Sequence, residues 1–122
     1  MTTIHRFRDL KVWQRSLTFV TSVYRATAKF PKNELFGLTG QFRRAATAIP
    51  LNIAEGAGSG TDAEFCRFLR IAFRSAYEVM AILDVARSLD FLDDETYRDL
   101  TKEADGIAAM LYALINSIQP GK

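Results

Sequence analysis

Apolar residues recur every three or four positions in four stretches of the chain, which is the spacing of amphipathic helices. The first stretch carries two neighbouring apolar rows, which are Leu10, Trp13, Leu17, Val20 and Tyr24, and Val12, Phe19, Val23, Ala26 and Phe30. The residue before a proline avoids helical geometry, so Pro31 should end this element. We expect a helix over about residues 9–30.

A cluster of glycines separates the second stretch from the third. The second has one apolar face over residues 34–57, made of Leu38, Phe42, Ala45, Ile49 and Ile53, and it should end at Gly56, Gly58 and Gly60. Pro50 lies inside this stretch, so we predict one helix kinked at Pro50. Thr61 and Glu64 have the spacing of a capping box, which predicts that a third helix starts there and spans residues 62–90.

The fourth stretch follows Asp93 and Asp94, either of which can cap a helix over residues 94–118. The chain shows no strand-like alternation of apolar and polar residues, and the connections between stretches are short. We therefore predict an all-α protein, an antiparallel up-down four-helix bundle, as a single domain spanning residues 1–122. The first and third helices have apolar faces wide enough for a core and a second surface, so we expect a homo-oligomer.

The supply of reactive side chains limits the chemistry. His5 is the sole histidine and lies outside the predicted helices, so neither a hydrolase triad nor a di-metal bundle site can be assembled. Cys66 is the sole cysteine, which excludes an internal disulfide and a metal site made of several thiolates. We expect no catalytic residue, no cofactor and no metal, and hence a protein that is not an enzyme.

Two features bear on location. The longest uninterrupted apolar run, Ile107 to Ile115, is too short to cross a bilayer. The first ten residues lack the apolar core of a signal peptide. We expect a cytoplasmic protein that makes no contact with a membrane.

Three polar residues, Asn52, Glu55 and Glu78, fall within the most apolar stretches. A buried carboxylate needs a partner such as Arg44 or a backbone donor, or else its pKa must rise. We expect these three side chains to be paired for structural reasons. Acid–base catalysis by Glu55 and Glu78 is the alternative.

The net charge of +2 hides an uneven distribution. Residues 1–60 hold nine basic and three acidic residues, a sum of +6, and residues 61–122 hold seven basic and eleven acidic residues, a sum of −4. A basic patch repeated around an oligomer binds nucleic-acid phosphates. The candidate contacts are Arg43, Arg44, Lys11 and Arg15 in the basic half, with Arg67 and Arg70 joining them if their helix lies alongside. The alternative is a solvated face neutralised by salt bridges, such as one between Arg74 and Glu78.

Short motifs occur along the chain in an order that resembles one protein family. They are Asp9-Leu10-Lys11-Val12-Trp13, Phe30-Pro31, Gly37-Leu38-Thr39, Arg43-Arg44-Ala45-Ala46, Ile49-Pro50, Asn52-Ile53-Ala54-Glu55-Gly56, Glu64-Phe65, Phe68-Leu69 and Ile71-Ala72. Over roughly residues 7–118 the chain resembles the bacterial family encoded by intervening sequences in 23S rRNA genes, whose members are called four helix bundle proteins.

This resemblance implies a four-helix protomer that assembles into a homopentamer. A related protein, the accessory variability protein of diversity-generating retroelements, associates with a reverse transcriptase and binds nucleic acid through a basic surface. The partners implied here are therefore RNA or DNA, and a reverse transcriptase or another ribonucleoprotein. Arg43 and Arg44 match the family motif and are the first candidates for phosphate contact, followed by Lys11 and Arg15. The alternative function is a protein–protein interaction scaffold without nucleic-acid affinity.

Overall fold

Four long α-helices account for most of the chain in the computed structural model, which describes residues 6–119. They are α1 (Lys11–Thr27), α2 (Leu38–Ala57), α3 (Asp62–Ser88) and α4 (Asp94–Ile118). Two 3-10 turns, η1 (Phe7–Asp9) and η2 (Lys32–Glu34), precede α1 and α2. No strand occurs among the described residues, and the predicted all-α class is confirmed.

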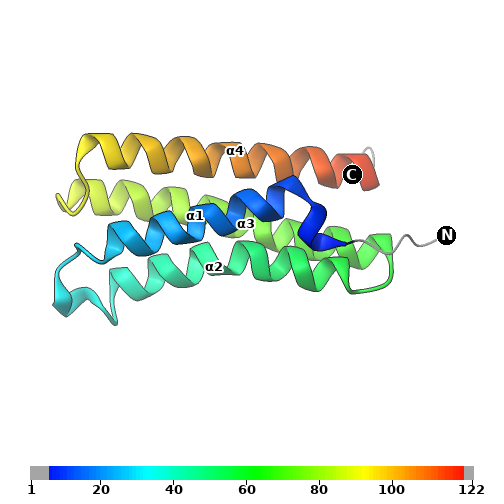
Figure 1. Ribbon diagram of the computed structural model, residues 1–122, viewed down its shortest axis with the longest axis horizontal. Helices are drawn as coiled ribbons and strands as arrows, with labels where there is room; N and C mark the ends of the chain where they lie inside the picture. Colours follow the sequence, from blue (N-terminus) through cyan, green and yellow to red (C-terminus); the bar gives the residue numbers. More distant parts are fainter. Residues whose placement is uncertain (1–5, 120–122) are drawn as a thin grey trace.

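The helices run alternately up and down and lie side by side along one long axis (Figure 1). Each helix packs on its neighbour in sequence and α1 packs on α4, whereas the backbones of the diagonal pairs stay apart throughout residues 6–119. The order around the bundle is therefore α1, α2, α3, α4, which confirms the predicted antiparallel four-helix bundle. The α1–α2 and α3–α4 connections lie at one end, and the α2–α3 connection lies at the other (Figure 1).

One apolar core runs along the bundle axis, and all four helices contribute to it. Its largest fully buried side chains include Phe19 on α1, Phe42 on α2, Phe65 on α3 and Leu111 on α4. Burying a side chain of this size stabilises the fold by about 1.5–3 kcal/mol relative to leaving it in water. The apolar rows of the sequence therefore determine which face of each helix turns inward.

Helices α2 and α3 approach closely near the end of α2. A Cβ atom at Gly56 would lie 2.7 Å from the Cβ of Phe68, whose position the α3 backbone fixes. Only a residue without a side chain fits there. At Gly58, just past the end of α2, the nearest atoms would be 3.7 and 3.8 Å from an added Cβ, which is ordinary contact. Gly60 lies in the following turn with a φ of +93°.

Side-chain oxygens cap α3 and α4 at their starts. The Thr61 hydroxyl accepts a hydrogen bond from the Glu64 N–H (3.2 Å), and the Asp93 carboxylate accepts one from the Thr96 N–H (2.7 Å). Both satisfy backbone donors that the first turn of a helix leaves free. The bond from Thr96 also lowers the pKa of the Asp93 carboxyl. The return bond of the predicted capping box is not formed within the described residues, because the Glu64 carboxylate binds Arg67 instead.

The first two helices are shorter than the ranges expected from the sequence. Helix α1 ends at Thr27, and the chain then tightens into a turn in which the Phe30 N–H donates to the Thr27 carbonyl (3.0 Å). Helix α2 begins at Leu38, because Glu34 lies before the helix and its carboxylate accepts the Leu38 N–H (3.0 Å). Helix α2 continues past Pro50, and a kink at this residue stays a prediction.

Candidate nucleic-acid interface

The antiparallel arrangement divides the predicted phosphate contacts between the two ends of the bundle. Arg43 and Arg44 lie in the first two turns of α2, at the end where α1 stops. Arg67 and Arg70 lie in the first third of α3, at the other end. The part of α2 beyond Arg44 is alone about 20 Å long at 1.5 Å per residue. These two pairs of arginines do not form one patch.

Lys11 and Arg15 lie in the first turns of α1, at the same end as the start of α3. Lys11 is exposed, whereas Arg15 is half-buried against α4. The Nη2 of Arg15 lies 3.1 Å from Oε1 of Glu103, and its Nη1 lies 3.4 Å from the sulfur of Met110. Gly106 provides the room, since a Cβ there would lie 2.9 Å from Nη2 of Arg15. The Arg15 guanidinium therefore links α1 to α4 through Glu103 and Met110.

Arg67 and Arg70 are also engaged by neighbouring side chains. The Nε of Arg67 lies 3.1 Å from both carboxylate oxygens of Glu64, and its guanidinium lies 4.5 Å from the centre of the Phe68 ring. This pairing lowers the pKa of Glu64 and raises the pKa of Arg67. The Nη2 of Arg70 donates to Oε1 of Gln119 (3.3 Å). Both arginines already have local partners that a phosphate would have to displace.

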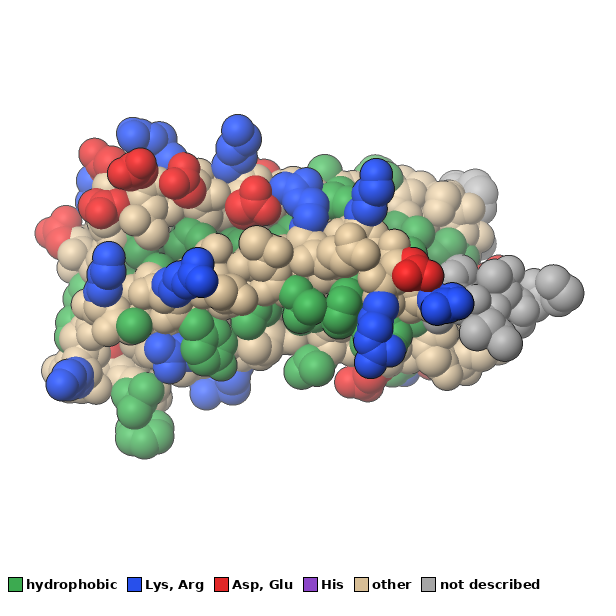
Figure 2. All heavy atoms as spheres, in the orientation of Figure 1, with side chains coloured by type: hydrophobic (Ala, Val, Ile, Leu, Met, Phe, Trp, Pro, Cys, Tyr) green, Lys and Arg blue, Asp and Glu red, His purple; other side chains and the backbone are tan. Residues whose placement is uncertain are grey.

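Arg43 and Arg44 belong to a larger basic group that the sequence analysis did not single out. We call this group the cationic end, and it consists of Arg25, Lys29, Lys32, Arg43 and Arg44. Figure 2 shows Lys and Arg side chains spread over the end of α1 and the start of α2, and Asp and Glu side chains gathered over the start of α4. Among residues 6–119, no member of the cationic end forms an ion pair.

Arg43 is held in place while part of its guanidinium stays free. Its Nε donates to the hydroxyl of buried Thr27 (2.9 Å), which in turn donates to the Val23 carbonyl (2.8 Å). The guanidinium carbon lies 4.4 Å from the centre of the Tyr24 ring, a cation–π distance. Since only Nε is used by Thr27, the terminal nitrogens are left for the bidentate geometry in which arginine binds phosphate.

Arg44 is exposed and turns back towards the loop that precedes α2. Its Nη1 would lie 3.3 Å from a Cβ atom at Gly40, and the Leu35 carbonyl oxygen would lie 2.8 Å from the same atom. The guanidinium and the loop backbone thus both lie close to Gly40, where a side chain would collide with them. Lys32, Leu35 and Arg43 line a small hollow of about 230 Å³ beside this point.

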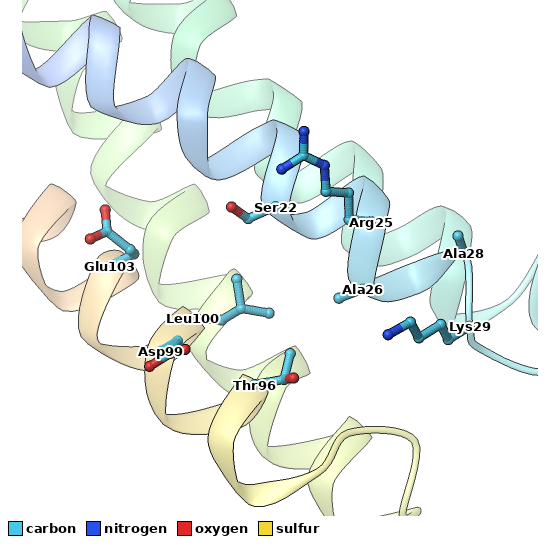
Figure 3. A pocket seen from close by; sticks show the side chains of 9 residues that line it. All are labelled: Ser22, Arg25, Ala26, Ala28, Lys29, Thr96, Asp99, Leu100 and Glu103. Atoms are coloured by element: carbon cyan, nitrogen blue, oxygen red, sulfur yellow. The ribbon is translucent and has the colours of Figure 1, made fainter.

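Helix α4 limits the cationic end on one side. A groove of about 620 Å³ runs between α1 and α4, with Arg25 and Lys29 on one wall and Asp99 and Glu103 on the other (Figure 3). Lys29 also contributes, after the Thr96 hydrogen bonds, to the lowered pKa of Asp93. The acidic wall repels phosphate, so the surface open to a polyanion is the side formed by α1 and α2.

The three polar residues expected inside the apolar stretches lie elsewhere. Glu55 and Glu78 are exposed, so the expectation of buried, paired carboxylates is wrong: both lie on the outward side of their helices. Asn52 is half-buried and donates through Nδ2 to the Ala48 carbonyl (2.8 Å), which is a structural role. Within residues 6–119 no group of three or more His, Cys, Asp and Glu side chains is placed to hold a metal ion. His5 lies outside the described residues.

Two apolar surfaces lie on opposite sides of the bundle. The first, which we call the α1/α2 groove, has a volume of about 430 Å³ and is lined by Phe7, Arg8, Trp13, Leu17, Val20, Thr47, Pro50, Leu51 and Ala54. The second, the α3/α4 slot, has a volume of about 330 Å³ and is lined by Phe73, Tyr77, Met80, Asp105, Ala108, Ala109 and Tyr112. The order of helices around the bundle places the groove and the slot back to back. No described helix is long and apolar enough to span a membrane.

Comparison with known proteins identifies both the family and the fold. Residues 8–113 match the family model described as 23S rRNA-intervening sequence protein. A crystal structure of a protein of unknown function from the S23 ribosomal protein family of Bacteroides thetaiotaomicron superposes with a TM-score of 0.79 at 24% sequence identity. The alignment covers 86% of this chain and 95% of that one, and it establishes a common fold. None of the curated proteins matches the chain significantly.

Proposed function

The chain belongs to the 23S rRNA-intervening sequence protein family, and from this premise we propose that it is a non-enzymatic, self-associating bundle that binds RNA or DNA through the cationic end. A ribonucleoprotein that exposes its nucleic acid is a ligand of the same chemistry. The proposal narrows the six contacts expected from the sequence to Arg43 and Arg44, and it adds Lys32. Arg25 and Lys29 face the acidic wall of α4 and contribute to the local potential.

The observation that carries the proposal is that five basic side chains without a carboxylate partner among the described residues gather at one end of the bundle. Arg15 and Arg67 each have a carboxylate within about 3 Å, at 3.1 and 3.0 Å. The members of the cationic end have no such partner among the described residues. Unpaired cations on one surface raise the local potential and release counterions when they meet phosphates, which favours binding of a polyanion.

The test is a titration of labelled RNA and DNA with the protein at several salt concentrations. We expect affinity to fall steeply between about 50 and 200 mM salt, because each phosphate contact releases counterions. Replacing both Arg43 and Arg44 by Ala should weaken binding and reduce the slope of log K against log salt by about 2.

The matched control removes the same charge from α4. Arg98 and Lys102 are exposed and lie on the helix whose start is acidic, so Arg98→Ala with Lys102→Ala should change binding much less. Circular dichroism checks that both double variants keep the bundle. Absence of any complex with RNA or DNA at low salt, or equal losses in both double variants, would reject the assignment.

Self-association is supported by the α1/α2 groove and the α3/α4 slot. Because the two surfaces differ and lie back to back, the groove of one copy can receive the slot residues of the next, which is a heterologous contact. Contacts of this kind close into a ring when the rotation between copies divides a full turn. A homopentamer is the ring size that the family resemblance implies.

Sedimentation of variants tests the self-association. Leu51 lies in the groove and is 60% exposed, so Leu51→Glu should dissociate the oligomer without unfolding the protomer. Val85→Glu is the matched control, since Val85 is 46% exposed on α3 and does not line the groove or the slot. A wild-type protein that sediments as a stable monomer at micromolar concentration rules out this part of the proposal.

The second candidate function is a protein–protein interaction scaffold, and the α1/α2 groove favours it. The groove is almost entirely apolar and has Trp13 and exposed Leu17 on its α1 wall, which is the composition of a surface that binds another helix. A reverse transcriptase or another ribonucleoprotein subunit is the partner class implied by the resemblance. A partner bound here would keep its affinity at high salt, which distinguishes the scaffold from the nucleic-acid binder.

A further inference from the structure

Phe36 is the most exposed large apolar side chain among the described residues. It is 95% exposed and lies in the loop between η2 and α2, next to Leu35, which is 49% exposed. Within the described residues its ring makes no contact with another aromatic ring. A phenylalanine in this position contributes nothing to the core, and its ring is free to contact a ligand.

The loop that carries Phe36 is held in a defined shape. The Gly37 N–H donates to the Glu34 carbonyl (2.9 Å), and the Leu35 N–H donates to the Lys32 carbonyl (3.2 Å). The Glu34 carboxylate, the one acidic group in the loop, is occupied by the Leu38 N–H at the start of α2. Backbone bonds on both sides of Phe36 thus limit its movement, and the ring projects from a fixed base.

Basic side chains lie near Leu35, the residue that precedes this ring in the chain. Lys32 lies in η2, directly before this loop. The Nη1 of Arg44 and the Leu35 carbonyl oxygen both lie close to Gly40, at 3.3 and 2.8 Å from where a Cβ would be. Arg43 lines the hollow that Lys32 and Leu35 also line. An exposed aromatic ring on a loop with unpaired cations close by is a combination by which proteins hold single-stranded nucleic acid, since the ring stacks on a base and the cations bind the adjoining phosphates.

We propose that Phe36 stacks on an unpaired base, and that the cationic end therefore binds single-stranded or looped nucleic acid in preference to a duplex. This inference rests on the proposed function and specifies its ligand. In a duplex the bases are stacked on each other and covered, so the ring has no free face to meet. Arg43, Arg44 and Lys32 contact phosphates in both kinds of ligand, whereas Phe36 acts on unpaired bases.

An anionic membrane is the other surface that attracts an apolar side chain with basic neighbours. The apolar area here is small, because Leu35 and Phe36 together bury much less surface than an acyl chain, and one acyl chain gives only marginal membrane binding. Two of the three basic neighbours are arginines, whose planar donor pairs match phosphate oxygens. Nucleic acid is therefore the occupant that the observations favour.

The experiment compares Phe36→Ala, Phe36→Leu and Phe36→Trp with the wild-type protein. The ligands are labelled oligouridine, a blunt duplex of mixed sequence and vesicles containing phosphatidylserine. We expect Phe36→Ala to weaken oligouridine binding about 5- to 150-fold, the range for losing one base–aromatic stack, and to leave duplex binding unchanged. Phe36→Leu should lose as much as Phe36→Ala, because leucine keeps apolar surface but cannot stack. Phe36→Trp should keep the affinity, and its new indole should be quenched by the RNA.

Each contrary result points to a different failure. If oligouridine binds the wild type and Phe36→Ala equally well, the stacking inference is wrong and the proposed function stands. If Phe36→Leu binds like the wild type, or if the variants change only vesicle binding, the ring serves an apolar contact and the inference is overturned. If the wild type binds neither nucleic acid at low salt, the proposed function fails as well. Since Phe36 is exposed, all three variants should fold, and circular dichroism verifies this.

Discussion

The close contact between α2 and α3 predicts opposite effects for alanine at two glycines that lie two residues apart. At Gly56 an added Cβ would lie 2.7 Å from the Cβ of Phe68. Carbon atoms in contact lie about 3.5–4.0 Å apart, so the two helices must separate by about 1 Å. At Gly58 an added Cβ meets nothing closer than 3.7 Å, and the φ of −88° suits any residue.

The magnitude follows from two opposing effects. Forcing an extra methyl group into a packed contact costs about 1–3 kcal/mol, and replacing glycine by alanine in a helix returns about 0.5–1 kcal/mol. The difference is a loss of about 0–2.5 kcal/mol of unfolding free energy for Gly56→Ala, with a middle value of about 1 kcal/mol. Each kcal/mol lowers Tm by about 3–5 °C at this chain length. Gly58→Ala should be neutral or raise stability by up to about 1 kcal/mol, because alanine restricts the unfolded chain.

Thermal and urea unfolding followed by circular dichroism measures both variants, at one protein concentration because association itself adds stability. Gly60→Ala is a third comparison in the same turn, since a φ of +93° strains alanine without any steric contact. We expect Gly56→Ala and Gly60→Ala to lie below the wild type and Gly58→Ala at or above it. A Gly56→Ala protein as stable as Gly58→Ala would refute the claim that close helix contact, and not turn flexibility, requires this glycine.

Three further predictions concern single side chains. Because the pKa of the Asp93 carboxyl is lowered from 3.8, the carboxylate contributes fully to stability above that pH, and the contribution is lost as the pH falls through the lowered pKa. Asp93→Asn keeps a capping side chain without this titration. Its stability should therefore change less with pH below about pH 4 in an acid titration. Burial raises the pKa of the Cys66 thiol, so it should react with iodoacetamide only after unfolding, and rapid labelling of native protein at pH 8 would contradict its burial. Gly106→Ala places a Cβ 2.9 Å from the flexible end of Arg15, which must then shift away from Glu103. That ion pair is part-exposed and weak, so the gain in helix propensity from alanine should exceed the loss and raise the urea midpoint. A lower midpoint would show that the ion pair contributes more than the helix propensity.

The sequence predicted the fold well because the relevant signals are local. The three- and four-residue spacing identifies the inward face of each helix, and Thr61 and Asp93 cap α3 and α4 as expected for their residue types. The ends of α1 and α2 were less predictable. Glutamate is a good helix former, so the sequence predicts Glu34 inside the helix, yet its carboxylate accepts the Leu38 N–H from outside α2. The apolar periodicity does not distinguish a residue within the first turn from a residue that caps it.

The candidate site was only partly predictable because it depends on distances between helices. Arg43 and Arg44 were identified from motif and charge, but Arg67 was grouped with them although antiparallel packing puts it at the opposite end. A signal for this was available, since the known direction of each helix and a rise of about 1.5 Å per residue give the end at which each arginine lies. No such signal existed for Glu78, because the third helix has apolar residues on both sides of it and only packing shows which side faces out.

The up-and-down course of the four helices has a practical consequence for how this molecule can be attached to other things. The first described turn, Phe7–Asp9, and the last helical residue, Ile118, lie at the end opposite the cationic end (Figure 1). A tag, a fused domain or a sensor surface joined at that end of the bundle would therefore lie roughly one helix length, about 30 Å, from Phe36 and the cationic end. A protein attached to a surface at that end would expose the Phe36 loop to the solution, where a nucleic acid can reach it without passing the surface.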